Sequence, residues 1–453
     1  MRAVAQKRSQ FARQSLRQLN STTKLSLLNQ IELAPPDKIL GLTEAFNRDP
    51  NPDKVNLTVG IYKDNSGKVT TLPAIARAQR IIDHHDVLNR NLSYLPIKGG
   101  KDYADSVKNF LYDESCAPSA KSAGYQNTPN YGKDLLANNR ISFTQTLSGT
   151  GALAICAKFL SLFVSKKVFI PNFSWANHKN IFSSNGFKEF KNYSYYDAKT
   201  GQLTVDQWLK DLRAQVSADS SKEPSCIILH ACCHNPTGLD PTREDWDKII
   251  DTINELKMIP IIDMAYQGME SGDLIKDAYV LRKCIDPKYV CDNGIFLCQS
   301  FAKNMGLYGE RVGSLSIVSP SNAPPTVKEA VDSQLKRIIR SIYSSPPGYG
   351  SRVANLVLTD PELKQQWGKD VQNMVARLQG IRNDLAGNLD WSAVNDSQQH
   401  GMFFFTGFPL KTVQKLRDEY SIYLTDDGRL SLSGINDSNI EYVSDTFKTI
   451  RQE

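Results

Sequence analysis

The sequence predicts an α/β fold: a mainly parallel sheet sandwiched between helices, together with a second, smaller α+β domain. In the middle of the chain, short apolar runs such as SCIILH and MIPIID end in polar or glycine residues, and an amphipathic helical pattern follows. Continuous apolar strands that alternate with helices are typical of a parallel sheet covered on both faces. After about Met374 the pattern changes to a long polar helix, the strands GMFFFTGF and GRLSLSG, and a closing helix, which indicates the second domain.

The N-terminal segment differs in charge from the rest of the chain. Residues 1–31 hold six basic residues and no Asp or Glu, whereas the whole chain of 453 residues holds 54 basic and 48 acidic ones. The remaining chain is therefore formally neutral, which argues against nucleic acid as the main partner. A basic segment rich in Ser, Thr and Gln, without a compact apolar core, predicts a mitochondrial transit peptide and a location in the mitochondrial matrix. A disordered basic arm that binds nucleic acid or lipid is the alternative.

The folded part is expected to begin near PPDKIL, residues 35–40, where two prolines stiffen the chain. Between about residues 117 and 139, the Gly, Pro and Asn content predicts a polar loop. The apolar run GALAICAKFLSLFV, residues 151–164, is shorter than the roughly 20 residues that a membrane span needs, and it contains Lys158. It predicts a buried helix of a soluble protein, and no membrane span is expected.

Four apolar runs in the central part are expected to be strands of the sheet: KVFIPNFSW, SCIILHACCHNPTG, MIPIIDMAYQG and GIFLCQSFAKN. The second run precedes REDWDKIIDTINELK, whose apolar residues at Trp246, Ile249, Ile250 and Ile253 have helical spacing. Ligands of an open parallel sheet bind at the carboxyl ends of its strands. The residues expected at those ends are therefore the candidate site residues: Trp175, Asn235, Asp263, Tyr266, Ser300 and Lys303.

The eight cysteines show neither disulfide-framework spacing nor zinc-ligand spacing. Most of them lie in hydrophobic context, including the adjacent Cys232 and Cys233. Reduced, buried thiols in a reducing compartment are expected, and no metal site is predicted.

Several candidate residues together meet the needs of one cofactor, pyridoxal phosphate. A lysine that forms a Schiff base with this cofactor needs a carboxylate that keeps the pyridine nitrogen protonated. Asp263 can supply that carboxylate for Lys303, because the two are one strand–helix–strand unit apart in the sequence. Trp175 can hold the plane of the ring. Taken alone, Asp263 could instead be a helix N-cap.

The cofactor's phosphate also needs an anchor, for which the N-terminus of a helix is suited because its N–H groups are exposed. The segment SGTG, residues 148–151, lies just before an apolar helical pattern, and Ser300 and Arg311 could add to it. The segment could also be a tight turn. It is not a Walker loop, because the required Gly-Lys-Ser/Thr is missing, so a nucleotide-binding protein is a poor alternative.

Four motifs carry a resemblance to a known family: HNPTG at 234–238, DMAYQG at 263–268, SFAKNMGLYGERVG at 300–313 and YSSPPGYGSR at 343–352. They closely resemble motifs of the aspartate aminotransferases, a group of class I pyridoxal-phosphate aminotransferases. The resemblance extends from about residue 35 to the C-terminus and, with the basic N-terminal arm, is to mitochondrial forms of fungal type. It implies the type I fold of pyridoxal-phosphate transferases, whose large domain contains a seven-stranded sheet.

The resemblance also implies domain boundaries. Residues 1–31 would be the transit peptide, and 32–70 the N-terminal arm with part of the small domain. Residues 71–373 would form the large cofactor-binding domain, and 374–453 the rest of the small domain. The insert near residues 119–133 departs from the family pattern and is expected to be a surface loop away from the site.

The residue roles that the resemblance implies begin with the cofactor. Lys303 would form the Schiff base, Asp263 would pair with the pyridinium nitrogen, and His178 would support Asp263 from behind. Asn235 and Tyr266 would hydrogen-bond the ring oxygen. The other implied contacts are stacking by Trp175, phosphate binding by Ser148, Gly149, Thr150, Ser300 and Arg311, and a phosphate contact from Tyr94 of a neighbouring subunit.

Two arginines would select the substrate. Arg429 would bind the α-carboxylate, and Arg340 would reach across a homodimer with shared active sites to the side-chain carboxylate of aspartate or glutamate. The residue type is suitable, because a planar guanidinium matches the two oxygens of a carboxylate. An exposed salt bridge is the alternative role for each arginine. Gly60 would leave room for the substrate, and Trp175 and Asn235 would also contact it.

The implied activity is reversible amino-group transfer between L-aspartate and 2-oxoglutarate, giving oxaloacetate and L-glutamate by a ping-pong route through pyridoxamine phosphate. Lys303, Asp263 and Tyr266 would be the catalytic residues. An aromatic aminotransferase or a carbon–sulfur lyase is a rival, but a pocket for neutral side chains gains nothing from a buried Arg340. A non-catalytic binding protein is a further rival, which would not need Lys303, Asp263 and Arg429 together.

Overall fold

The computed structural model describes residues 28, 31–33, 40–89, 91–113, 131–221, 223–287, 293–320 and 322–452. The predicted transit peptide therefore lies almost entirely outside the described residues, as do Cys116 and Cys291. The six cysteines within these ranges are free and buried. No helix in the described ranges is both long and apolar enough to cross a membrane.

A seven-stranded sheet forms the centre of the fold, with the strand order β2-β10-β9-β8-β7-β3-β4. The strands are β2 (Ile141–Leu147), β3 (Lys167–Pro171), β4 (Glu189–Tyr193), β7 (Cys226–His230), β8 (Ile259–Met264), β9 (Ile295–Ser300) and β10 (Val312–Val318). All neighbouring pairs are parallel except those of β10, which runs antiparallel to both β2 and β9. The predicted mainly parallel sheet is thereby confirmed.

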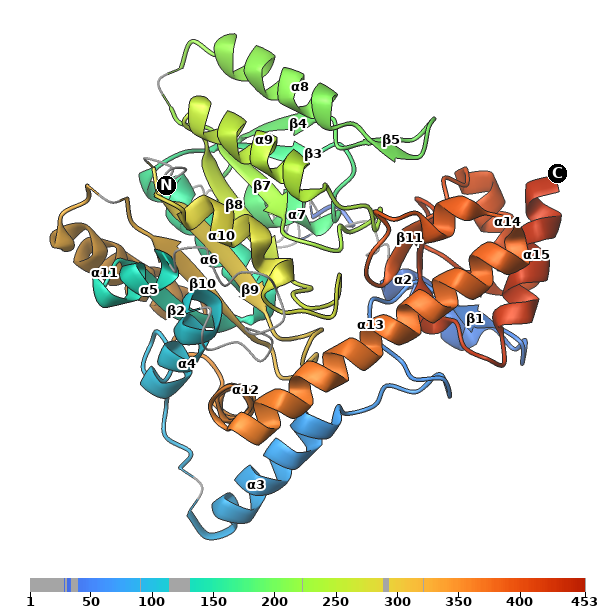
Figure 1. Ribbon diagram of the computed structural model, residues 1–453, viewed down its shortest axis with the longest axis horizontal. Helices are drawn as coiled ribbons and strands as arrows, with labels where there is room; N and C mark the ends of the chain where they lie inside the picture. Colours follow the sequence, from blue (N-terminus) through green and yellow to red (C-terminus); the bar gives the residue numbers. More distant parts are fainter. Residues whose placement is uncertain are drawn as a thin grey trace, which may run out of the picture.

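Both faces of the sheet are buried by helices (Figure 1). Along β7, Ile227 and Leu229 belong to one hydrophobic core, whereas Cys226 and Ile228 belong to the core on the opposite face. This alternation explains the unbroken apolar run, because successive side chains of a strand point to opposite sides.

Different helices cover the two faces. The first core includes residues of α3 (Pro73–Asn89), α4 (Lys101–Tyr112), α8 (Val205–Ser217), α9 (Arg243–Glu255), α10 (Tyr279–Ile285) and α12 (Tyr349–Thr359). The second includes residues of α6 (Ser148–Phe163), α7 (Asn177–Ser184) and α11 (Pro325–Ile342). Helix α9 begins with a capping box between Thr242 and Asp245, as suits its predicted start.

A third hydrophobic core lies in a separate group of elements drawn from both ends of the chain. Strand β1 (Val55–Asn56) pairs in parallel with β12 (Ile422–Tyr423), so residues near the N-terminus are part of the C-terminal unit. The other elements here are α2 (Leu40–Arg48), β11 (Phe403–Phe405), β13 (Arg429–Ser431), α14 (Leu410–Tyr420) and α15 (Ile440–Gln452). Short elements complete the fold: β5 (Tyr196–Asp197), β6 (Gln202–Leu203), η3 (Lys276–Ala278), η4 (Ser392–Asn395) and η5 (Leu432–Gly434).

Helix α13 (Pro361–Leu389) connects the two units and runs as one long helix between them (Figure 1). It begins well before Met374, where the sequence pattern changes. The Asp360 side chain caps this earlier start by accepting hydrogen bonds from the N–H groups of Glu362 and Leu363. Trp367 packs in the first core and Leu385 in the third, so one helix contributes to both.

The expectation of a loop from 117 to 139 is wrong at its C-terminal end, whereas residues 117–130 lie outside the described residues. Helix α5 (Tyr131–Ala137) occupies part of this segment, and Leu135 is buried in the first core. The helix packs against α4. A helix of this length owes its stability to such tertiary packing rather than to its own sequence, which contains a glycine.

Candidate active site

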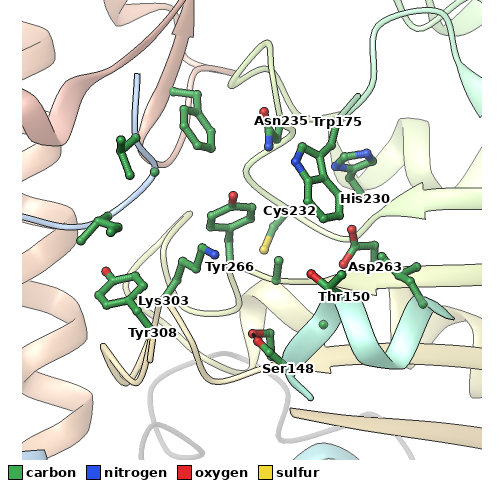
Figure 2. Close-up of a pocket in the computed structure, with 18 of the residues that line it drawn as sticks. Ser148, Thr150, Trp175, His230, Cys232, Asn235, Asp263, Tyr266, Lys303 and Tyr308 are labelled. Atoms are coloured by element: carbon green, nitrogen blue, oxygen red, sulfur yellow. Dashed lines mark hydrogen bonds between the residues drawn. The ribbon is translucent and has the colours of Figure 1, made fainter. Parts of the chain in front are cut away.

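A cavity of about 380 Å³ lies at the carboxyl ends of the parallel strands, bordered by β13 and the segment after β1. Figure 2 shows side chains converging on it from several elements, with Lys303 and Tyr266 on one side and Trp175, His230 and Asp263 on the other. Twelve of the predicted site residues line this single cavity: Gly60, Ser148, Gly149, Thr150, Trp175, Asn235, Asp263, Tyr266, Ser300, Lys303, Arg311 and Arg429.

Lys303 lies just past the end of β9, in the turn that leads to β10. Its Nζ is 5.9 Å from the ring centre of Tyr266 and 6.0 Å from that of Tyr308. Burial, together with the nearby Arg311 guanidinium, lowers the pKa of Lys303 to about 8, although the Asp263 carboxylate opposes the shift. An amine with this pKa is partly unprotonated near neutral pH and can act as a nucleophile or base.

Asp263 lies in β8, next to the strand that ends at Ser300, and its carboxylate is held from behind. The ring Nε2 of His178 is 3.0 Å from Oδ2 of Asp263, and Nδ1 of His178 is 2.9 Å from the Ser174 hydroxyl. Burial raises the pKa of Asp263, but the hydrogen bond to His178 and the nearby His230 and Lys303 outweigh burial, so the net pKa is lowered. Asp263 is therefore a buried carboxylate that stays ionised.

The N-terminus of α6 points into the cavity without a side-chain cap and without an acidic residue in its first turn. Beside it, the Ser148 and Ser300 hydroxyls are 2.7 Å apart. Arg311 also lines the cavity, and its Nη1 donates to the Tyr308 carbonyl at 3.0 Å. The Ser148 N–H donates to the Arg311 carbonyl at 3.1 Å. The N–H groups that follow it at the start of α6, two hydroxyls and a guanidinium form an arrangement suited to a phosphate-like anion.

Arg429 is buried at the start of β13 and lines the cavity. Its Nη1 donates to Oδ1 of Asn235 at 3.0 Å, and its Nη2 donates to the Thr58 carbonyl at 2.7 Å. The guanidinium lies over the Phe403 ring at 4.4 Å, and its Nε has no hydrogen-bond partner among the described residues. Burial lowers the pKa of Arg429, although the Asp427 carboxylate opposes the shift. Among the described residues, no carboxylate is hydrogen-bonded to the guanidinium. An anionic ligand would satisfy it.

Three predicted site residues lie outside the cavity lining. His178 is behind Asp263, as described above. Tyr94 is 94% exposed, and Arg340 is an exposed residue near the end of α11, with Nη1 close to the Ser344 hydroxyl. The structure of one chain therefore does not bring Tyr94 and Arg340 to the site.

The cavity lining also contains residues that the sequence reasoning missed: Thr58, His230, Cys232, Tyr308 and Phe403. His230 and Cys232 flank the end of β7, so their place at a strand end was a signal in the sequence. Nothing in the sequence marks Phe403 as a site residue, because an aromatic residue in a strand is ordinarily part of the core. It packs so closely that a Cβ added at Gly60 would be 2.7 Å from its Cζ.

Comparisons with known proteins agree with this geometry. Residues 52–447 match the family Aminotransferase class I and II. The chain is 56% identical to the mitochondrial aspartate aminotransferase of Saccharomyces cerevisiae over 441 residues, which is 94% of this chain and 95% of the relative. Its fold is similar to the cytoplasmic aspartate aminotransferase of the same yeast, with a TM-score of 0.84, 36% identity, and coverage of 94% and 99% of the two chains.

A second solved structure carries a bound cofactor. It is an aromatic-amino-acid aminotransferase from Burkholderia pseudomallei, covalently bound to pyridoxal phosphate, with a TM-score of 0.81 and 35% identity. The similarity covers 94% of this chain and 100% of the Burkholderia chain. The family match spans most of the chain and includes every element that lines the cavity. The chain therefore belongs to the class I and II aminotransferases.

Proposed function

We propose that this chain is a pyridoxal-phosphate-dependent aspartate aminotransferase, which exchanges the amino group between L-aspartate and 2-oxoglutarate to give oxaloacetate and L-glutamate. The observation that carries the proposal is one cavity that holds a lysine of lowered pKa, a buried ionised carboxylate and a buried arginine whose guanidinium has no hydrogen bond to a carboxylate of the described residues. The 56% identity to an aspartate aminotransferase supports the substrate choice.

The donor set of the cavity fits pyridoxal phosphate. The uncapped N-terminus of α6, with Ser148, Ser300 and Arg311, would hold the phosphate. Asp263 would keep the pyridine nitrogen protonated, which suits its lowered pKa. Further contacts would come from Gly149 and Thr150 to the phosphate, from Trp175 to the face of the ring, and from Asn235 and Tyr266 to the ring oxygen.

Lys303 would anchor the cofactor covalently and then move the proton that the reaction requires. Pyridoxal phosphate, when bound, supplies an electron sink that stabilises negative charge at the substrate α-carbon. Lys303, freed by the incoming amino acid, would take the proton from that α-carbon and return it at the cofactor C4′ atom. Its pKa of about 8 suits both uptake and release of the proton, because the charged and the neutral amine are both populated near neutral pH. Replacing Lys303 with Ala is expected to abolish turnover.

Arg429 would bind the α-carboxylate of the substrate, which would accept a hydrogen bond from the buried Nε that has no partner among the described residues. Arg340 would bind the second carboxylate from the partner subunit of a homodimer, and Tyr94 would reach the partner's cofactor phosphate. The high exposure of Tyr94, Leu92 and Ile342, at 94%, 83% and 53%, supports a partner that covers this region. A small-domain movement would exclude water from the cavity.

The proposed domain division has residues 71–373 as the large domain and 32–70 with 374–453 as the small one. The third hydrophobic core supports it, because all of its buried members except Cys232, Cys233, Tyr266 and Met269 come from the two ranges of the small domain. The mitochondrial name of a yeast relative supports a mitochondrial location, and the matrix is the proposed compartment.

Visible absorption of the purified holoenzyme tests the function. We expect the cofactor band to be lost when glutamate alone is added and to return with oxaloacetate. A cofactor band that responds to neither would contradict aspartate transamination, and an aromatic aminotransferase would instead respond to phenylalanine or tyrosine. No visible band, even after pyridoxal phosphate is added, would contradict the assignment of Lys303.

A further inference from the structure

Asp240 closes the loop that follows β7 and carries Asn235. The Cys233 N–H donates to its Oδ2 at 2.6 Å, and the His234 N–H donates to its Oδ1 at 2.9 Å. The Asp240 side chain is buried, with 3% of the residue exposed. Both of its oxygens therefore bind the turn directly before Asn235.

This turn has a conformation that needs support. Cys233 has a φ of +52°, in the left-handed region that residues with a Cβ rarely adopt. Without the Asp240 carboxylate, two buried N–H groups would also lose their acceptor, which is unfavourable in a buried loop. Asp240 thus determines where the backbone before Asn235 lies.

From this turn, Asn235 holds one arm of the Arg429 guanidinium. Its Oδ1 accepts the hydrogen bond from Nη1 at 3.0 Å. Among the described residues, the only other acceptor for the guanidinium is the Thr58 carbonyl, which binds Nη2. A displaced Asn235 would leave Nη1 free to rotate away from the cavity. The orientation of Arg429 therefore depends on the position of Asn235.

The other end of the loop is joined to the chain that leads to β11. The Asp240 N–H donates to the Gln398 carbonyl at 3.1 Å, and the His400 N–H donates to the Gly238 carbonyl at 2.7 Å. Gly238 has a φ of +70°, and a Cβ there would be 2.3 Å from the Phe403 carbonyl, so glycine is required. Asp240 thus lies where the loop is fixed to the unit that contains Arg429.

We propose that Asp240 is a positioning residue for the substrate carboxylate: it holds the 233–234 turn so that Asn235 orients Arg429. The inference rests on the proposed function, in which Arg429 binds the carboxylate that amino acid and oxo acid share. Asp240 does not line the active-site cavity, so it acts through Asn235 and not by contact with the substrate.

A neighbouring carboxylate offers a matched control. Asp277 is buried, with 2% of the residue exposed, and lines the same 250 Å³ cavity as Asp240, together with Glu270 and His400. Its oxygens accept hydrogen bonds from the Ser271 hydroxyl at 2.5 Å and the Glu270 N–H at 2.9 Å. Asp277 therefore has a similar environment, but it makes no hydrogen bond to residues 233–235, all of which the structure describes.

Steady-state kinetics of Asp240→Asn and Asp277→Asn holoenzymes compare the two acids. We expect Asp240→Asn to raise KM for both aspartate and 2-oxoglutarate by about tenfold, at unchanged cofactor content, and Asp277→Asn to leave both KM values within about twofold of wild type. Equal KM changes in the two variants would overturn the proposal, because Asp240 would then be merely structural. If Asp240→Asn does not fold, Asp240→Glu, which keeps the carboxylate, is compared with Asp277→Glu by the same criterion.

A double-mutant cycle tests the route through Asn235. In the background of Asn235→Ala, Asp240→Asn should raise KM no further, since the group through which it acts is gone. Additive increases in KM would overturn the proposal.

Hydrogen exchange gives a readout that does not depend on catalysis. The amides of Cys233 and His234 should exchange faster in Asp240→Asn and remain as protected as wild type in Asp277→Asn. Equal protection in both variants would overturn the proposal. A wild-type protein without transaminase activity would instead contradict the proposed function, while the exchange result would still decide whether Asp240 holds the turn.

Discussion

The imidazole of His178 and the carboxylate of Asp263 form a buried pair, with Nε2 and Oδ2 3.0 Å apart. His178 is completely buried and comes from α7, whereas Asp263 comes from β8. The carboxylate therefore approaches the cavity already bound on its far side, and this hydrogen bond helps to keep its pKa low.

Removing this support should impair catalysis. We expect His178→Ala to raise the pKa of Asp263 and to lower kcat roughly ten- to hundredfold, the cost of a lost hydrogen bond to a charged group. The loss should grow as pH falls, because a protonated Asp263 cannot keep the pyridine nitrogen protonated by charge pairing. The measurement is the pH profile of kcat. His84→Ala changes an exposed histidine of α3 and serves as the control, and identical profiles for both variants would contradict this role.

A substitution of Arg429 should lower kcat/KM for both substrates to a similar extent. Replacement with Lys keeps the charge but loses the planar fork, and it leaves Oδ1 of Asn235 or the Thr58 carbonyl without its donor. We expect kcat/KM for aspartate and for 2-oxoglutarate to fall by about a hundredfold each, corresponding to roughly 3 kcal/mol. Initial rates at varied concentrations of each substrate provide the test. A loss confined to one substrate would argue against binding of the shared carboxylate.

A substitution of Arg340 should lower kcat/KM for dicarboxylate substrates only. Arg340→Ala is expected to lower kcat/KM for aspartate by roughly a hundredfold, with little change for phenylalanine, which has no second carboxylate. Arg337→Ala is the matched control, since Arg337 is an exposed arginine of the same helix whose Nη1 is 3.4 Å from Oε1 of Gln334. Equal losses on aspartate and phenylalanine would show that Arg340 does not select the substrate.

Glu270 should limit stability at high pH. Burial, with the neighbouring Asp240 and Asp277 carboxylates, raises its pKa from the ordinary 4.5 to about 10. The folded protein then binds a proton that the unfolded chain releases, so its stabilising contribution is fully present below about pH 4.5 and is lost as pH rises toward 10.

Glu270→Gln should remove this dependence. We expect its Tm at pH 8–9 to exceed that of wild type by about 2 °C or more, with a smaller difference at pH 5. Differential scanning calorimetry across this range gives the comparison. Glu255→Gln is the control, because Glu255 is exposed and paired with Arg213, which lowers its pKa. A parallel pH dependence of Tm in wild type and Glu270→Gln would refute the interpretation.

The strand ends were predictable because their signals are local. An apolar run that terminates in Asp263 or Ser300 indicates both the strand and the polar residue at its end, and the parallel sheet then brings such ends together. Lys303 could be predicted as a site residue because it follows the end of a predicted strand by only a few residues in the sequence. Family motifs supplied the roles, which spacing alone leaves open.

Other features depend on contacts that no local pattern contains. Helix α5 is stabilised by burial of Leu135, and α13 begins early because Asp360 caps it. Phe403 reaches the cavity only because β11 pairs with β13. Asp240 has its partners in a turn of unusual backbone conformation, which the sequence HNPTG does not reveal without the positive φ of Cys233.

The parallel pairing of β1 with β12 joins residues 55–56 to residues 422–423. During synthesis, the N-terminal partner leaves the ribosome hundreds of residues before the C-terminal one, so this pair cannot form while the chain is still growing. The unit that holds Arg429 must therefore assemble after translation, when the sheet has had time to fold. A chain that stalls or is cut before β12 would still contain Lys303 and Asp263, yet it would lack the Arg429 guanidinium that lines the same cavity. Such a fragment could retain groups for the cofactor while losing the means to hold a substrate.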